Sequence, residues 1–270
     1  MDGLSRERIA LKSAPELARI RAAGRVVAEV LSEVAAAVAP GITTLELDRL
    51  AEAATRRRGA EPAFLGYHGF PASICASINE EVVHGIPSPS RVLREGDIIG
   101  LDFGAVLDGA YGDSAVTVGV GLIAPEAQAL IEVTRAALAC GIAEARPDRK
   151  VGDIGAAIQA FVEARGYSVV RDFVGHGIGR RLHEPPQVPN FGTRGTGRRL
   201  RPGMVLALEP MVNLGSFEVD TLDDGWTAVT ADGRLSAHFE HTIVVTENVP
   251  EILTLADGSE GTQFLELVGR

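Results

Sequence analysis

The chain has 270 residues and a formal net charge of −10, with 46% hydrophobic and 23% charged residues. This composition is that of an ordinary globular protein long enough to bury a sizeable core. The acidic balance argues against a general nucleic-acid binder, which needs a basic surface. No stretch approaches the ~18–20 apolar residues of a membrane span, and the N-terminus lacks an apolar signal core. The two cysteines, Cys75 and Cys140, are too few for a disulfide framework. We therefore expect a cytoplasmic protein without membrane contact.

Two helices are predicted in the first part of the chain. The first begins at Ser13, with Glu16 placed three residues later as in a capping box. Its apolar residues recur at three- and four-residue steps until Pro40-Gly41 ends the pattern. The second helix opens with the same kind of box at Thr43. Residues 1–10 precede both helices and are predicted to form a flexible tail.

Strands are predicted after these helices. Segments 73–78 and 97–103 have the apolar, β-branched composition of strands, and Asp108-Gly109 is a hairpin signal. Asp102 and Asp113 are therefore expected on paired antiparallel strands, where two acids on one face can approach each other.

The order of two helices followed by strands occurs again in the second half. Helices are predicted over 124–145 and from 151 to near 166, and strands return from Val169. The second half carries two insertions that the first lacks, a loop-like stretch at 179–199 and a segment between residues 209 and 240 with two Asp-Gly turns. Insertions on a rigid scaffold are common places for binding surfaces.

A short motif is repeated in the two halves. Residues 93–102 and 200–209 both read Leu-Arg-x-Gly, then an apolar run, then leucine and an acid. A second acid follows each copy at the head of another apolar run, and a His-Gly-Ile precedes each copy. Repeated sequence implies repeated structure. We expect one domain over 11–270, made of pseudo-repeat halves at about 11–123 and 124–250, since no linker separates them.

If the halves pack about a pseudo-two-fold axis, four acids converge on one place: Asp102, Asp113, Glu209 and Glu240. Such a cluster cannot be fully ionised without a counter-charge, because like charges in one site disfavour ionisation. A divalent metal, or a pair of ions ~3.5–4 Å apart, supplies that charge. One histidine among carboxylates favours Mn, Fe or Co over a zinc site rich in sulfur or imidazole.

The histidines of the two His-Gly-Ile motifs are also candidates. His176 lies between glycines, which let the backbone approach a site, and imidazole is a common metal ligand. His84 is its repeat partner and can shuttle a proton or hold a substrate amide at the same cavity. For His183, in the first insertion, the residues alone leave a solvent-exposed histidine and a site residue equally open. The others are expected to have structural or supporting roles: His68, His238 and His241.

Together these motifs resemble the type I methionine aminopeptidases over roughly residues 10–255. The resemblance is carried by six segments: 77–87, 102–104, 111–113, 175–179, 209–211 and 239–242. It implies the pita-bread fold, an α/β (α+β) architecture of two pseudo-symmetric halves with a curved antiparallel sheet flanked by helices. It also implies removal of the initiator methionine from nascent proteins when the second residue is small.

The same resemblance implies five ligands for two divalent ions, which are Co, Mn, Fe, Zn or Ni: Asp102, Asp113, His176, Glu209 and Glu240. By this resemblance, Asp113 and Glu240 would bridge the ions, Asp102 would complete one site, and His176 with Glu209 would complete the other. The resemblance further implies that bound ions would supply an activated water for hydrolysis of the first peptide bond, with Glu209 as the candidate proton shuttle.

The resemblance also implies how substrate is held. His84 contacts the scissile amide, and His183 lies near the carbonyl oxygen. The methionine side chain enters a pocket of aromatic rings and a soft thiol, which suit a thioether: Phe64, Tyr67, Phe70, Cys75 and Trp226. The expected partners are nascent polypeptide N-termini, with transient contact at the ribosome, and the expected state is a monomer.

Two other functions stay open at this point. Xaa-Pro aminopeptidases and prolidases share the metal-binding scaffold, but they usually carry a separate N-terminal domain, for which residues 1–60 are too short. A non-catalytic relative would use the cleft as a binding module. Such proteins lose metal ligands, whereas this chain keeps the whole set.

Overall fold

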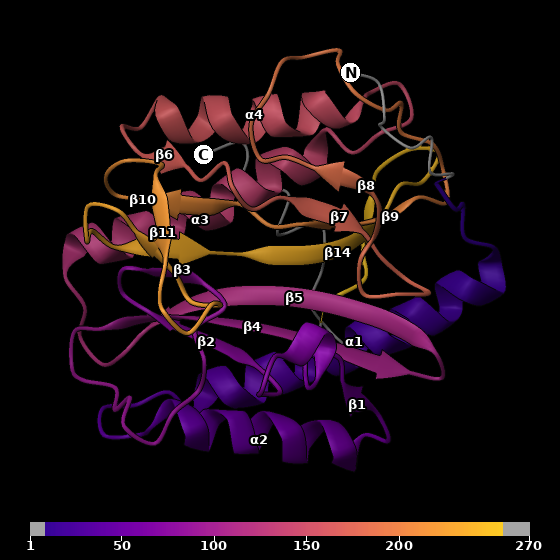
Figure 1. The fold of residues 1–270 in the computed structure, drawn as a ribbon. Coiled ribbons are helices and arrows are strands. Elements are labelled where there is room, and N and C mark those ends of the chain that lie inside the picture. Colours follow the sequence, from indigo (N-terminus) through magenta and orange to yellow (C-terminus); the bar gives the residue numbers. More distant parts are fainter. Residues whose placement is uncertain (1–8, 256–270) are drawn as a thin grey trace.

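Two pairs of helices lie on opposite sides of a central layer of strands (Figure 1). The computed structural model describes residues 9–255. Helices α1 (Ala14–Ala36) and α2 (Thr44–Arg57) lie on one side, and α3 (Pro125–Ala143) and α4 (Val151–Glu163) on the other. The predicted order of two helices and then strands in each half is confirmed. No helix between residues 9 and 255 is long and apolar enough to cross a membrane.

The first two helices begin at the predicted capping boxes. The Glu16 carboxylate accepts hydrogen bonds from the N–H and the hydroxyl of Ser13 at 2.8 and 2.6 Å, and Glu46 does the same for Thr43 at 2.8 and 2.7 Å. These bonds satisfy donors that a helix start leaves unpaired. Helix α1 ends at Ala36, before the predicted Pro40-Gly41, because its last turn tightens into bonds between residues three apart.

The largest sheet contains strands from both halves, in the order β1-β4-β5-β14-β9-β7-β8, with β2 beside β4 and β15 beside β14. Its strands are β1 (Glu61–Pro62), β2 (Cys75–Ile78), β4 (Ile98–Leu107), β5 (Ala110–Gly119), β7 (Gly175–Gly177), β8 (Glu184–Val188), β9 (Val205–Leu208), β14 (Glu240–Val244) and β15 (Glu251–Ile252). The predicted β4–β5 hairpin is confirmed, and both of its turn residues, Asp108 and Gly109, have positive φ angles of 49° and 73°.

Strands β5 and β14 join the two halves at the centre of the sheet (Figure 1). Each is also paired with a strand of its own half, β5 with β4 and β14 with β9, so the two halves repeat the same arrangement. Side chains fix the register of the join. The Ser114 hydroxyl donates to the Glu240 carbonyl at 2.6 Å, and the Thr242 hydroxyl donates to the Asp113 carbonyl at 2.8 Å. These bonds place the second acid of each motif copy on neighbouring strands.

The two insertions form strands that build up the site. The prediction of an irregular loop over 179–199 is wrong for β8, which pairs with β7. Its prolines are tolerated because β8 lies at the sheet edge, where a missing N–H leaves no partner unsatisfied. In the second insertion, β11 (Val219–Thr221) and β12 (Ala228–Thr230) flank the predicted Asp224-Gly225 turn. Strand β12 also pairs with β3 (Glu81–Val83), so the second insertion packs against the first half of the chain.

The structure also contains a third sheet, of three strands, and a short 3-10 helix. The sheet contains β6 (Ser168–Val169), β10 (Met211–Asn213) and β13 (Ser236–His238). A short 3-10 helix lies at Tyr67–Gly69. Of the predicted tail, Ile9 packs against the core under α3 and α4. Residues 1–8, and residues 256–270 of the predicted domain, lie outside the part of the chain described.

Helix α1 lies directly against β5 because both carry glycine at their contact. A Cβ added at Gly112 would lie 2.9 Å from the Gly24 backbone. A Cβ added at Gly24 would lie 2.4 Å from the carbonyl oxygen of Leu253. The two glycines therefore allow the close packing that supports the strand bearing Asp113.

Replacing Gly24 with alanine should lower the free energy of unfolding by about 1–3 kcal/mol, because the new methyl group has no room. Ala22→Lys is the matched control on the exposed face of α1 and should change stability by no more than about 0.5 kcal/mol. Urea denaturation of both variants measures the difference. A stabilised Gly24→Ala variant would contradict the packing described, since the gain in helix propensity would then outweigh the contact.

Candidate metal centre

A cavity of about 240 Å³ lies where the two halves meet. It brings together every site residue named from the sequence: Phe64, Tyr67, Phe70, Cys75, His84, Asp102, Asp113, His176, His183, Glu209, Trp226 and Glu240. The polar members and the apolar members thus form one continuous lining rather than separate sites.

The four acids come from four different strand positions. Asp102 is on β4 and Asp113 is on β5, Glu240 begins β14, and Glu209 directly follows β9. Asp102 lies opposite Ala115, two residues from Asp113, so the alternation of side chains puts both aspartates on one face of the sheet. The pairing of β5 with β14 then brings Glu240 to the same face.

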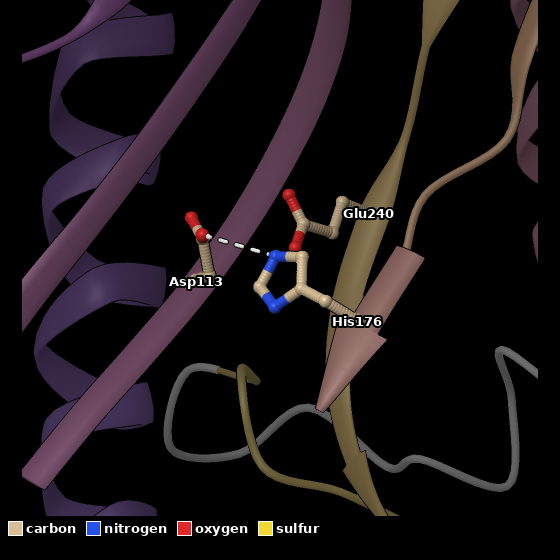
Figure 2. A group of neighbouring side chains, drawn as sticks. All are labelled: Asp113, His176 and Glu240. Carbon is tan, nitrogen blue, oxygen red and sulfur yellow. Dashed lines mark ion pairs between the residues drawn. The ribbon is translucent and has the colours of Figure 1, made fainter. Parts of the chain in front are cut away.

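Asp113, His176 and Glu240 surround a common point (Figure 2). Each offers one ligand atom, and these atoms lie within 4.8 Å of one another. Nε2 of His176 is 3.9 Å from Oδ2 of Asp113 and 3.5 Å from Oε1 of Glu209. The sticks in Figure 2 point toward one another from β5, β7 and β14, which combine both halves of the chain.

The carboxylates lie close to one another, with Asp113 and Glu240 buried and Asp102 and Glu209 partly buried. Burial raises the pKa of Asp102 to about 7. Burial, followed by the charges of Asp102 and Glu209, raises the pKa of Asp113 well above its usual value. Burial also raises the pKa of Glu209 and of Glu240, and neighbouring acids add to both effects. The cluster therefore resists full ionisation in the absence of a cation.

Several oxygens of this cluster have no hydrogen-bond partner within the described residues: Asp102 Oδ1, Asp113 Oδ1 and Glu240 Oε1. Buried polar atoms without partners are costly, and they occur where another group satisfies them. Hard carboxylate oxygens with one imidazole are a ligand set for divalent cations. The residues present thus fit a divalent metal.

His176 is prepared to act as a neutral ligand. Burial, followed by the nearby His183, lowers the pKa of His176 to about 3. Its Nδ1 lies 2.9 Å from the carbonyl oxygen of Gly177. With the proton on Nδ1 donated to that carbonyl, Nε2 presents its lone pair to the acids.

Two further histidines face the cavity from different loops. The Nδ1 atom of His183 is 2.7 Å from the hydroxyl of Tyr67, and its ring centroid is 4.2 Å from that of His176. His84 has a positive φ of 61°, in the left-handed region that few residues other than glycine adopt. Burial and the charge of His183 lower the pKa of His84, which favours its neutral form.

The other end of the cavity is apolar. The rings of Phe70 and Trp226 meet edge to face with centroids 5.1 Å apart, and Phe64 packs in the same cluster. The Cys75 thiol is free and buried, and burial raises its pKa well above the usual value, so it stays an uncharged thiol. This lining suits an unbranched apolar side chain, including one with a sulfur atom.

Sequence reasoning did not place His68 and Leu182 at the site, although both line the cavity. Leu182 directly precedes His183, so adjacency to a candidate was the available signal. His68 lies between the predicted pocket residues Tyr67 and Phe70, and its ring centroid is 4.4 Å from that of Tyr67. The prediction of a structural or supporting role for His68 did not specify this place in the cavity lining.

The sequence profile of metallopeptidase family M24 matches residues 18–247. This chain belongs to metallopeptidase family M24. It is therefore similar to hydrolases that depend on a divalent metal, and the predicted class of enzyme is confirmed.

Individual proteins and solved structures are also similar to this chain. A methionine aminopeptidase of Clostridium perfringens is 54% identical over 92% of this chain and 99% of its own length. The crystal structure of a methionine aminopeptidase from Thermotoga maritima superposes with a TM-score of 0.91 at 48% identity, covering 92% of this chain and all of the other. A prolidase from Pyrococcus horikoshii shares the fold at 22% identity and a TM-score of 0.75, with 92% of this chain and 64% of that one covered. The predicted pita-bread fold is confirmed.

Without metal, this M24 chain should lose stability as the pH rises from 5 to 8. The folded-state pKa of Asp102 is about 7, above its unfolded value of about 3.9. The stabilising contribution of the protonated form is complete below the unfolded pKa and is lost as the pH rises through the folded pKa. Denaturation in a chelator measures this slope, and Asp102→Asn should make it shallower.

Asp108→Asn is the control, because Asp108 is exposed in the turn of the same hairpin. It should leave the slope unchanged. Adding a divalent ion at pH 7.5 should raise the melting temperature of the wild-type protein more than that of Asp102→Asn. Equal slopes in wild type and Asp102→Asn would show that this acid is not held protonated by the fold.

Proposed function

We propose that this chain is a methionine aminopeptidase, which hydrolyses the first peptide bond of polypeptides that begin with methionine. The supporting observation is a single cavity that joins an acid-rich metal site to an aromatic pocket. The identity of 54% to the Clostridium perfringens methionine aminopeptidase, over nearly the whole of both chains, supports the same reaction here.

In this proposal two divalent ions are held by Asp102, Asp113, His176, Glu209 and Glu240. When bound, the ions supply Lewis-acid activation of water and of the peptide carbonyl. Asp113 and Glu240, which come from adjacent strands of opposite halves, would hold the ions together with the other three ligands. The oxygen-rich ligand set favours Mn, Fe or Co.

Residues of the chain then move protons and orient the peptide. Burial raises the pKa of Glu209, which favours uptake of a proton by its carboxyl, and that proton could then be passed to the leaving amine. If the Tyr67 hydroxyl donates to Nδ1 of His183, Nε2 carries the proton and can donate to the substrate carbonyl oxygen. His84 would contact the scissile amide; its lowered pKa favours the neutral form, and its ring centroid lies 6.3 Å from that of Trp226.

The aromatic end of the cavity selects the first side chain. Phe64, Tyr67, Phe70, Cys75 and Trp226 offer apolar area and polarisable contacts to methionine. A small second residue is part of the proposal, as the resemblance implies.

The proposal also covers the setting in which the enzyme works. It acts as a monomer on nascent chains in the cytoplasm, with transient contact at the ribosome. Both cysteines are free, which suits a reducing compartment. Residues 11–270 are proposed to form one catalytic domain, because the site takes side chains from both halves.

The first test compares peptides. Purified protein supplied with Mn²⁺ or Co²⁺ should release methionine from Met-Gly-Met and leave an Xaa-Pro dipeptide essentially uncut. Product analysis by chromatography measures both rates. A higher kcat/KM for the Xaa-Pro dipeptide would favour prolidase activity instead.

A second test removes single ligands. Asp102→Ala and His176→Ala should each lower kcat by more than about 100-fold, since even supporting residues around a metal are worth 10–100-fold. The circular dichroism spectrum should stay that of the wild type, and Asp108→Asn should keep full activity. Retained turnover in either ligand variant would contradict the assigned ligand set.

A further inference from the structure

A buried ion pair links the start of the described chain to the loop that carries His183. Nζ of Lys12 lies 2.5 Å from Oε2 of Glu184, and their side chains are only 1% and 7% exposed. Lysine is rarely buried so completely unless it is paired. The pair joins residues 172 positions apart in sequence, so it fixes one segment against the other.

The second oxygen of Glu184 holds the loop backbone. Oε1 accepts hydrogen bonds from the N–H groups of Arg180 and Arg181 at 2.6 and 3.0 Å. Burial opposes ionisation of Glu184, but the bonds from Lys12 and these N–H groups outweigh it and lower its pKa. The ionised carboxylate of Glu184 therefore stabilises the turn between β7 and β8 through these hydrogen bonds.

Both ends of this turn carry histidines of the cavity. His176 is on β7, and His183 directly precedes Glu184, the first residue of β8. Lys12 is itself fixed, since its N–H donates to the Gly203 carbonyl at 2.8 Å. Its stem also packs on the turn, because a Cβ added at Gly179 would lie 2.8 Å from Lys12 Cε.

We propose that Lys12 is a positioning residue for His183, acting through Glu184, which rests on the proposed role of His183 at the substrate carbonyl. Removing Lys12 leaves the Glu184 carboxylate buried without its cation, and breaking a buried pair in this way is strongly unfavourable. The carboxylate then turns toward water and releases the two N–H groups. His183 loses its fixed distance to the reacting carbonyl.

The structural test is local hydrogen exchange. In Lys12→Met, amide exchange in residues 178–184 should rise at least about tenfold over the wild type under conditions where both are folded. Arg21→Met is the matched control, because it removes an ion pair between α1 and Glu251 that does not touch the turn. It should leave this exchange unchanged.

The functional test uses a double-variant cycle on Met-Gly-Met hydrolysis. Lys12→Met should lower kcat by roughly 10- to 100-fold, the usual cost of misplacing a reacting group by about 1 Å. The same change in a His183→Ala background should lower kcat by less than about twofold, because nothing remains to be positioned. The Arg21→Met control should keep kcat near the wild-type value.

Two results would overturn the proposal. One is unchanged exchange across 178–184 in Lys12→Met. The other is an equal loss of kcat with and without His183, which would show a general structural effect. A wild-type protein that releases no methionine would refute the proposed function, while the exchange comparison would still decide whether Lys12 holds the turn.

Discussion

Four acids share one cavity withdrawn from water, and much of the fold serves to keep them together. They come from β4, β5, β14 and the residue after β9, so neither half of the chain can assemble the cluster by itself. The join between β5 and β14 decides their placement. Hydroxyl bonds from Ser114 and Thr242 reach the backbone of the very residues, Glu240 and Asp113, whose carboxylates must meet. A slip of one residue in this join would turn one strand over relative to the other, so that Asp113 and Glu240 would point to opposite faces of the sheet.

The same closeness makes the cluster electrostatically costly. Burial raises the pKa of each acid, and neighbouring carboxylates raise it further for Asp113, Glu209 and Glu240. Three oxygens of the cluster lack partners within residues 9–255. A bound cation would neutralise the repulsion between the carboxylates and satisfy their free oxygens, so the cluster is expected to bind a cation strongly. The surrounding packing supplies rigidity. Glycines bring α1 onto β5, and the turn between β7 and β8 is closed by a buried carboxylate. Function at this site therefore depends on contacts well outside the ligand set.

Local and repeated features of the sequence predicted much of this architecture. Capping boxes marked the starts of α1 and α2, and the Asp-Gly turn marked the β4–β5 hairpin, because these signals act within a few residues. The repeated motif predicted that Asp102 and Asp113 would meet Glu209 and Glu240, since duplicated segments fold alike. The resemblance to a known family supplied the pocket residues.

Features that depend on distant contacts escaped prediction. The 179–199 stretch has loop composition, yet pairing with β7 makes part of it a strand. Lys12 lies just after the segment predicted to be a flexible tail, so its burial was not expected from the sequence. Its burial is explained by the ion pair with Glu184, which lies far along the chain. His68 carries no local mark of a site residue, because its place beside the pocket follows from the path of the whole loop.

The most direct test of the account is anomalous diffraction from crystals grown with Mn²⁺. We expect anomalous peaks within coordination distance of Asp113, Glu240 and His176, and a pair of peaks if both proposed sites fill. Loss of these peaks in crystals of His176→Ala would tie them to the ligand set. An empty cavity in crystals soaked at millimolar Mn²⁺, or peaks only at surface carboxylates, would contradict the claim that the two halves meet to hold metal.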